Sequence, residues 1–139
     1  MISEVQNSLL RLCDTTVSRL SAYLEELDKK AKKDKKAYTA EHYSFLCVIT
    51  DISEQLDAVL LDITAELEKA EEENNDEKTK IFTSLFDRGL LLKNTVEGFF
   101  SSSEDVLKND DFYNKLKKLT EVTLRKAIQI KGTYNLPIL

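Results

Sequence analysis

Residues 39–67 read TAEHYSFLCVITDISEQLDAVLLDITAEL, and the helical nature of the chain is clearest here. It contains no glycine or proline, and its apolar residues recur every three or four positions. Such spacing places a continuous apolar stripe along one face of a helix. The stretch therefore predicts a long amphipathic helix that begins at the cap residue Thr39. Its expected inward positions are Tyr43, Leu46, Ile49, Ile52, Leu56, Val59, Leu60, Ile63 and Leu67.

A similar stripe precedes this stretch. Ser3 and Gln6 have the spacing of a capping box, which predicts a first helix that starts there. Residues 29–36 follow it, and six of these eight residues are lysine, as expected for a solvated helix end and connection. The expected inward positions of the first helix are Val5, Leu9, Leu12, Thr16, Leu20, Leu24 and Leu27.

The third apolar segment follows an acidic stretch at residues 66–77. Asn74, Asn75 and Asp76 supply turn and cap chemistry before it. It has more apolar residues than one buried face requires, so we expect it either at the centre of the core or covered by another molecule. These residues are Ile81, Phe82, Leu85, Phe86, Leu90, Leu91, Leu92, Val96, Phe99 and Phe100.

The segment after the third stripe is expected to break at three serines, residues 101–103. Ser101 and Glu104 repeat the capping-box spacing, and Asp110 is expected to cap a fourth helix that ends at Gly132. Its expected inward residues are Phe112, Leu116, Leu119, Thr123, Ala127 and Ile130. We therefore expect one helical-bundle domain over residues 1–132 and an extended tail over residues 133–139.

These four stripes predict the fold class. The chain has only 3 Gly and 1 Pro in 139 residues, too few for the many turns of a β-sandwich or barrel. Four helices with short connections favour an all-α, antiparallel up-down-up-down four-helix bundle. Because the first two helices are read as longer than the third, we expect their hairpin to project past the bundle.

Charge and cysteine content narrow the range of partners. The formal net charge is −5, which gives the molecule no general attraction to nucleic acid or to anionic lipid. No apolar run is long enough to span a membrane. Cys13 and Cys47 lie in apolar helical patterns at different heights of the bundle, so we expect them to be reduced and buried. This pattern favours a cytoplasmic protein.

Catalytic patterns are missing from the sequence. His42 is the only histidine, so a site with two imidazoles in one subunit is impossible. Gly89, Gly98 and Gly132 are isolated and form no phosphate-binding loop. We therefore expect no enzyme activity, no metal, no cofactor and no small-molecule substrate. An exposed His42 on a four-helix bundle would suit a histidine phosphotransfer domain, which we keep as a minor alternative.

The remaining function class is protein binding. We expect a non-enzymatic interaction module, such as an adaptor, a scaffold or an assembly subunit, that binds a protein partner or a second copy of itself. The aromatic residues are expected to gather at one bundle end, either as a core plug or as a groove for a partner. A second alternative is a small acidic inhibitor or immunity-type protein that binds a basic partner through residues 66–77. The candidate binding residues are Tyr43, Phe82, Phe86, Leu90, Leu91, Phe99, Phe100, Phe112 and Tyr113.

Overall fold

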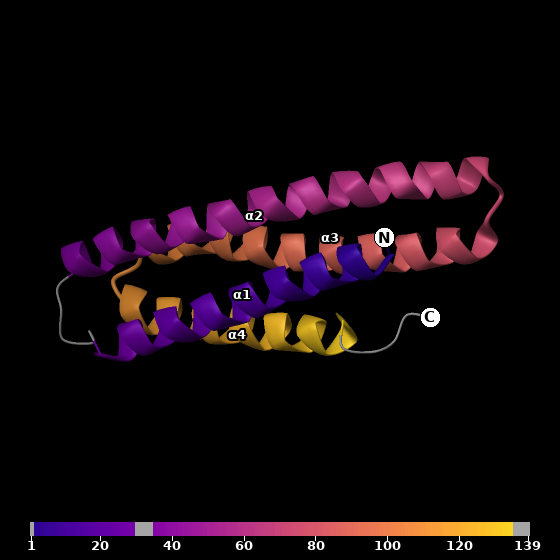
Figure 1. Ribbon diagram of the computed structural model, residues 1–139. Coiled ribbons are helices and arrows are strands. Elements are labelled where there is room, and N and C mark those ends of the chain that lie inside the picture. The colour runs from indigo at the N-terminus through magenta and orange to yellow at the C-terminus, as the bar shows by residue number, and fades with distance from the viewer. Residues whose placement is uncertain (1, 30–34, 135–139) are drawn as a thin grey trace.

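The computed structural model describes residues 2–29 and 35–134, which form four α-helices and no strand. The helices are α1 (Ile2–Lys29), α2 (Lys35–Glu72), α3 (Asp76–Val106) and α4 (Phe112–Tyr134). They run alternately up and down in one elongated bundle (Figure 1). The predicted all-α four-helix bundle is confirmed. None of these helices is long and apolar enough to cross a membrane within the described ranges.

α2 packs mainly against α3, and α1 packs mainly against α4; the α3–α4 contact is also extensive, and the α1–α2 contact is smaller (Figure 1). α1 and α3 lie on a diagonal of the bundle and make fewer contacts with each other. One core runs along the axis between all four helices. Its fully buried members include Leu9 and Leu20 on α1, Ile49 and Leu56 on α2, Leu85 and Leu92 on α3, and Leu116 and Ala127 on α4.

The turn between α2 and α3 has the predicted cap chemistry. The Asn75 side-chain oxygen accepts a hydrogen bond from the backbone N–H of Lys78 at 3.2 Å, which caps the start of α3. Asn74 adopts a positive φ of 54°, a conformation that asparagine tolerates better than most residues. Two adjacent asparagines therefore reverse the chain in a tight connection.

The hairpin of α2 and α3 projects past the ends of α1 and α4 (Figure 1). Gly89 of α3 lies beside Leu9 of α1, and α3 begins thirteen residues before Gly89 whereas α1 begins only seven residues before Leu9. We expected the hairpin of the first and second helices to project. The projecting hairpin is the next one along the chain, because α2 and α3 both continue past the start of α1 at this end.

Three predicted helix ends were wrong. α3 continues through the serines at 101–103, where the Ser103 hydroxyl donates to the Phe100 carbonyl at 2.9 Å. α2 begins at Lys35, four residues before the expected cap Thr39. α4 begins at Phe112 and continues past Gly132 to Tyr134, so the domain boundary at residue 132 falls inside a helix. Residues 135–139 of the expected tail and residues 30–34 of the lysine run lie outside the described residues.

The predicted inward faces were right for most positions and wrong for a few. Tyr43 is 57% exposed, whereas its neighbours His42 and Phe45 are buried. On α1, Tyr23 is buried, and the expected Leu24 is only partly buried. Cys47 is exposed, although we expected it inside the core. His42, which we expected at the surface, has no exposed area.

Candidate protein-interaction surface

The nine candidate binding residues fall into three groups. Phe82 and Phe99 are 2% and 1% exposed and belong to the core, so they offer no surface to a partner. Partly buried side chains pack against that core: Phe86, Phe112 and Tyr113. Exposed side chains form the third group: Tyr43, Leu90, Leu91 and Phe100. The exposed members do not share one surface, because Phe100 lines a groove with Ser53 of α2 and Leu91 lines another with Ile130 of α4. The structure does not bring the nine together as one site.

The aromatic end of the bundle is largely core. Tyr23 of α1 stacks on Phe45 of α2 with ring centroids 4.1 Å apart, and Phe99 of α3 meets the Phe45 ring edge-on at 5.6 Å. Beside this stack, the Tyr38 ring meets Phe112 and Tyr113 of α4 at 5.5 and 5.4 Å. Tilted and edge-on pairs of this kind stabilise a core beyond their buried area. The rings fill the space between the helices, as the core-plug interpretation expected.

His42 is the polar centre of this cluster. Its Nδ1 atom shares a 2.7 Å hydrogen bond with the Tyr23 hydroxyl, and its ring lies 5.9 Å from the Phe99 ring. Nε2 is buried and has no hydrogen-bond partner among the described residues. Burial lowers the pKa of His42 to about 4, because a buried imidazolium would lose its hydration. A phosphodonor has no access to either nitrogen, so we do not retain the phosphotransfer alternative.

Sequence reasoning missed the most exposed large hydrophobic side chain among those that the structure describes. Leu61 of α2 is 71% exposed, and it directly follows Leu60, whose side chain packs beside Gly89 of α3. Leu90 directly follows Gly89 and is 38% exposed. The two leucines therefore lie at the same height on the solvent side of the junction between α2 and α3. The sequence signal was present, since Leu60 and Leu61 cannot both face the core of one helix.

Polar contacts fix the register of this junction. Asp57 of α2 forms an ion pair with Lys93 of α3, and Lys93 also lies 3.7 Å from Glu97. One turn further along, the Ser53 hydroxyl donates to the same Glu97 carboxylate at 3.3 Å. The hydrogen bond from Lys93 to Asp57 raises the pKa of the lysine, so the side chain stays protonated beside these carboxylates.

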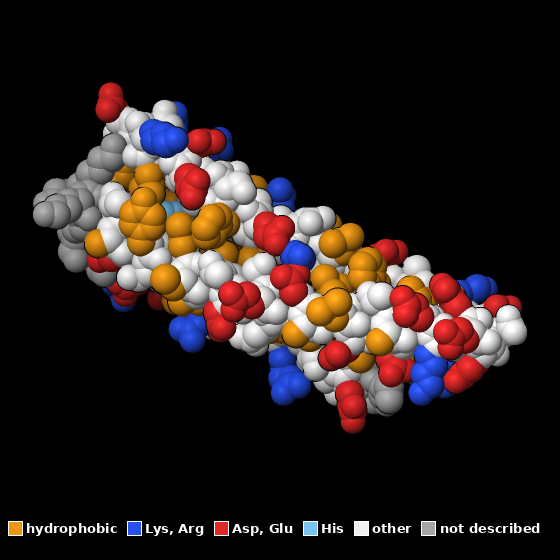
Figure 2. Space-filling view, turned by 90° about the horizontal axis from the view of Figure 1, so that it is seen from above, with side chains coloured by type: hydrophobic (Ala, Val, Ile, Leu, Met, Phe, Trp, Pro, Cys, Tyr) orange, Lys and Arg blue, Asp and Glu red, His pale blue; other side chains and the backbone are white. Residues whose placement is uncertain are grey.

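Phe86 extends the apolar surface at this junction. It lies one helical turn from Leu90 on the same side of α3 and is partly buried against the core. We call Leu61, Phe86 and Leu90 the α2–α3 patch. Figure 2 looks down on the side of the molecule that carries α2, and hydrophobic side chains there gather in separate groups with charged side chains between them. The patch is a local apolar surface with charged borders.

Two other exposed hydrophobic residues, Leu91 and Ile128, lie away from this junction. Leu91 lines a shallow groove between α3 and α4 together with Ile130 and Thr133. Ile128 of α4 is 50% exposed and lies one residue beyond Ala127, whose carbonyl accepts a hydrogen bond from the Cys13 thiol of α1 at 3.4 Å. Ile128 therefore belongs to the α1–α4 side and provides a matched control for the α2–α3 patch.

The two cysteines differ in environment. Cys13 is buried between α1 and α4, and burial together with the nearby Asp14 carboxylate raises its pKa to about 11. Cys47 is exposed on α2. Both are free thiols, as predicted. No three His, Cys, Asp or Glu side chains gather as a possible metal site in the part of the chain that the structure describes.

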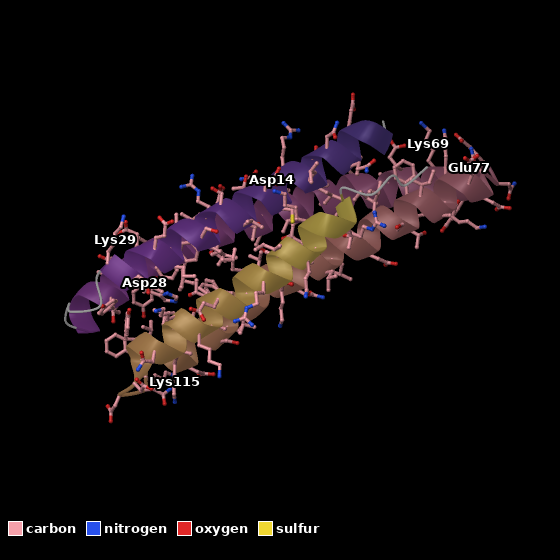
Figure 3. All side chains as sticks on the ribbon, turned by 90° about the horizontal axis from the view of Figure 1, so that it is seen from below. Asp14, Asp28, Lys29, Lys69, Glu77 and Lys115 are labelled. Atoms are coloured by element: carbon pink, nitrogen blue, oxygen red, sulfur yellow. The ribbon has the colours of Figure 1, made fainter. Side chains whose placement is uncertain are left out.

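Charged residues mark the two ends of the bundle (Figure 3). Lys69 and Glu77 lie on the projecting tip of the α2–α3 hairpin, where residues 71–73 are exposed glutamates. Asp28 and Lys29 lie at the opposite end of the bundle, where Asp28 forms a 2.7 Å ion pair with Lys117 of α4. Exposed pairs of this kind contribute little to stability, so they adjust the packing of the helices without determining it.

Comparisons of the chain with protein-family models, with curated proteins and with solved structures gave no match.

Proposed function

We propose that this protein is a non-enzymatic protein-binding module that presents the α2–α3 patch on a rigid four-helix bundle. The exposure of Leu61 carries the proposal, because 71% of this leucine is in water beside a second exposed leucine, Leu90. Single exposed leucines are common on soluble proteins, but neighbouring ones on two packed helices form a surface that a partner can cover.

The support for this surface comes from its position. Leu60 and Gly89 pack closely just beneath it, so the backbones of α2 and α3 hold the two leucines in fixed positions. A preorganised apolar surface binds with little loss of conformational entropy. Helices that present leucines in this way commonly receive the apolar face of another helix.

A site-specific crosslinking experiment tests the proposal. A photoreactive phenylalanine analogue replaces Leu90 in one variant and Ile128 in another, and each protein is irradiated in an extract of its native cells. We expect covalent adducts with a discrete partner from position 90 and none from position 128. Adducts from both positions alike, or from neither, would contradict a binding function for the patch.

Self-association is checked in the same samples. An adduct with the mass of two chains from position 90, together with a concentration-dependent molar mass in light scattering, would identify a second copy as the partner. This outcome preserves the binding function and changes the identity of the partner.

A further inference from the structure

We infer that the α2–α3 patch takes a basic amphipathic helix, in which an apolar stripe is flanked by lysine or arginine. This inference depends on the proposed binding function and adds the chemistry of the partner. The observations that carry it are the exposed leucines and the sign of the charges around them.

The border of the patch is acidic on both helices. Asp57 and Glu54 precede Leu61 by one and two turns on α2, and Glu68 follows it by two turns on the same side. On α3, Glu97 lies two turns beyond Leu90 and meets α2 through Ser53. All four carboxylate residues are exposed. From Glu54 to Glu68 the acidic border spans about 21 Å along α2, which matches about four turns of a docked helix.

The basic charge on this border is already engaged. Lys93 forms ion pairs with Asp57 and Glu97, whereas the exposed Glu54 and Glu68 are not among its partners. A partner whose apolar stripe is flanked by cations would supply the missing positive charge while it covers Leu61 and Leu90. Charge complementarity of this kind accelerates association and selects the partner.

The same charges disfavour binding of a second copy of the chain or of an anionic lipid surface at this patch. A second copy would bring Glu54, Asp57, Glu68 and Glu97 toward an identical acidic border, in a protein whose net charge is already −5. An anionic lipid surface would meet the same repulsion. A basic helix is the one partner of these three that the patch attracts by both its apolar centre and its acidic border.

Two synthetic helical peptides of about 18 residues test this inference. Both carry the same leucine stripe, and their remaining positions are lysine in one peptide and glutamate in the other. Isothermal titration calorimetry of the full chain should show binding of the lysine peptide that is about tenfold or more tighter than that of the glutamate peptide. The preference should shrink as salt is raised from about 50 to about 500 mM, because the border is exposed.

Variants locate the binding site. Leu61→Gln with Leu90→Gln should weaken binding of the lysine peptide by about tenfold or more, because the apolar contact is lost. Glu54→Gln with Glu68→Gln should reduce the preference for lysine over glutamate and leave the leucine contact in place. Ile128→Gln, on the opposite side of the bundle, should bind like the wild type. Far-UV circular dichroism of each variant confirms that the helices are retained.

The acidic hairpin tip is the competing site for any basic peptide. If Leu61→Gln with Leu90→Gln binds the lysine peptide as tightly as the wild type, the peptide docks at that tip and the inference is wrong. Equal affinity for both peptides, or no binding of either, would also overturn it. Adducts from position 90 in the crosslinking experiment would in those cases preserve the proposed binding function and exclude only the basic helix.

Discussion

Tyr23 of α1 and His42 of α2 share a buried hydrogen bond of 2.7 Å that joins the two helices inside the aromatic end of the bundle. The hydroxyl belongs to a ring stacked on Phe45, so packing fixes the position of the oxygen. Burial holds the imidazole neutral, and burial also raises the pKa of the Tyr23 hydroxyl above its usual value. The bond therefore joins two uncharged groups over the whole physiological pH range.

The stability of the fold should depend on pH through His42. The folded-state pKa of about 4 lies below the unfolded value of 6.5, so the neutral imidazole contributes stability that is complete above about pH 6.5. That contribution is lost as the pH falls toward 4. The loss should be about 3 kcal/mol, because each unit of pKa difference corresponds to about 1.4 kcal/mol.

The check is urea unfolding at several values between pH 7 and pH 4 for the wild type and for His42→Gln, which cannot titrate. The wild type should lose about 3 kcal/mol more of its unfolding free energy than the variant over this range. Parallel curves for the two proteins would show that His42 is not the titrating group.

Tyr23→Phe should destabilise the protein by about 1–3 kcal/mol, because it leaves the His42 Nδ1 atom buried without a partner. Tyr43→Phe is the matched control. Tyr43 is 57% exposed, so removal of its hydroxyl should leave no buried polar atom without a partner. Chemical denaturation of both variants should separate them. A loss for Tyr43→Phe as large as for Tyr23→Phe would argue against a special contribution of the buried hydrogen bond.

Alanine at two glycines of α3 should change stability in opposite directions. A Cβ atom at Gly89 would lie 2.9 Å from a methyl carbon of Leu60 and 3.2 Å from one of Leu9. Overpacking of a core costs about 1–3 kcal/mol, and the gain in helix propensity of about 1 kcal/mol offsets only part of it. Gly89→Ala should therefore destabilise the protein.

Gly98 provides the comparison, because an added Cβ atom there would meet no other atom within 4 Å. Gly98→Ala should raise the unfolding free energy by about 0.5–1 kcal/mol, as expected for an open position inside a helix. Thermal unfolding of the two single variants measures both effects. Stabilisation by Gly89→Ala of the same size would mean that Leu60 and Leu9 move aside at no cost.

The two thiols should react at different rates. Cys47 is exposed and should react with a chromogenic disulfide reagent within the mixing time of an ordinary assay at pH 8. Cys13 is buried and its pKa is raised to about 11, so only a small fraction is thiolate at that pH. The folded protein should therefore show one fast thiol, and the unfolded protein should show two. The variant Cys47→Ser should show no fast-reacting thiol, which would assign the fast reaction to Cys47.

The sequence predicted the fold class because apolar spacing and turn chemistry act locally. Asn75 was expected near the start of α3 and caps it, and the four apolar stripes became the four helices. The continuation of α3 through the serines at 101–103 could not be predicted. The Ser103 hydroxyl donates a hydrogen bond to a backbone carbonyl of the same helix, so this serine does not end it. A serine therefore ends a helix only where the surrounding packing allows it.

The candidate surface was predicted only in part. Leu90 and Phe86 were included, but Leu61 was missed because the apolar stripe of the second helix already accounts for one complete buried face. The burial of His42 was missed because its hydrogen-bond partner lies nineteen residues away on another helix. Such a partner becomes visible only when the relative height of the two helices is known, and apolar spacing does not determine that height.

Because the hairpin of α2 and α3 extends beyond α1 and α4, the length of this molecule can change while its four-helix core stays the same. Among the described residues, the outer turns of α2 and α3 pack on each other, so matched insertions or deletions of seven residues in both helices would preserve the apolar stripe. The same four-helix section could in this way carry a longer or a shorter arm. The reach of the acidic tip can then change between related chains while the α2–α3 patch stays in place.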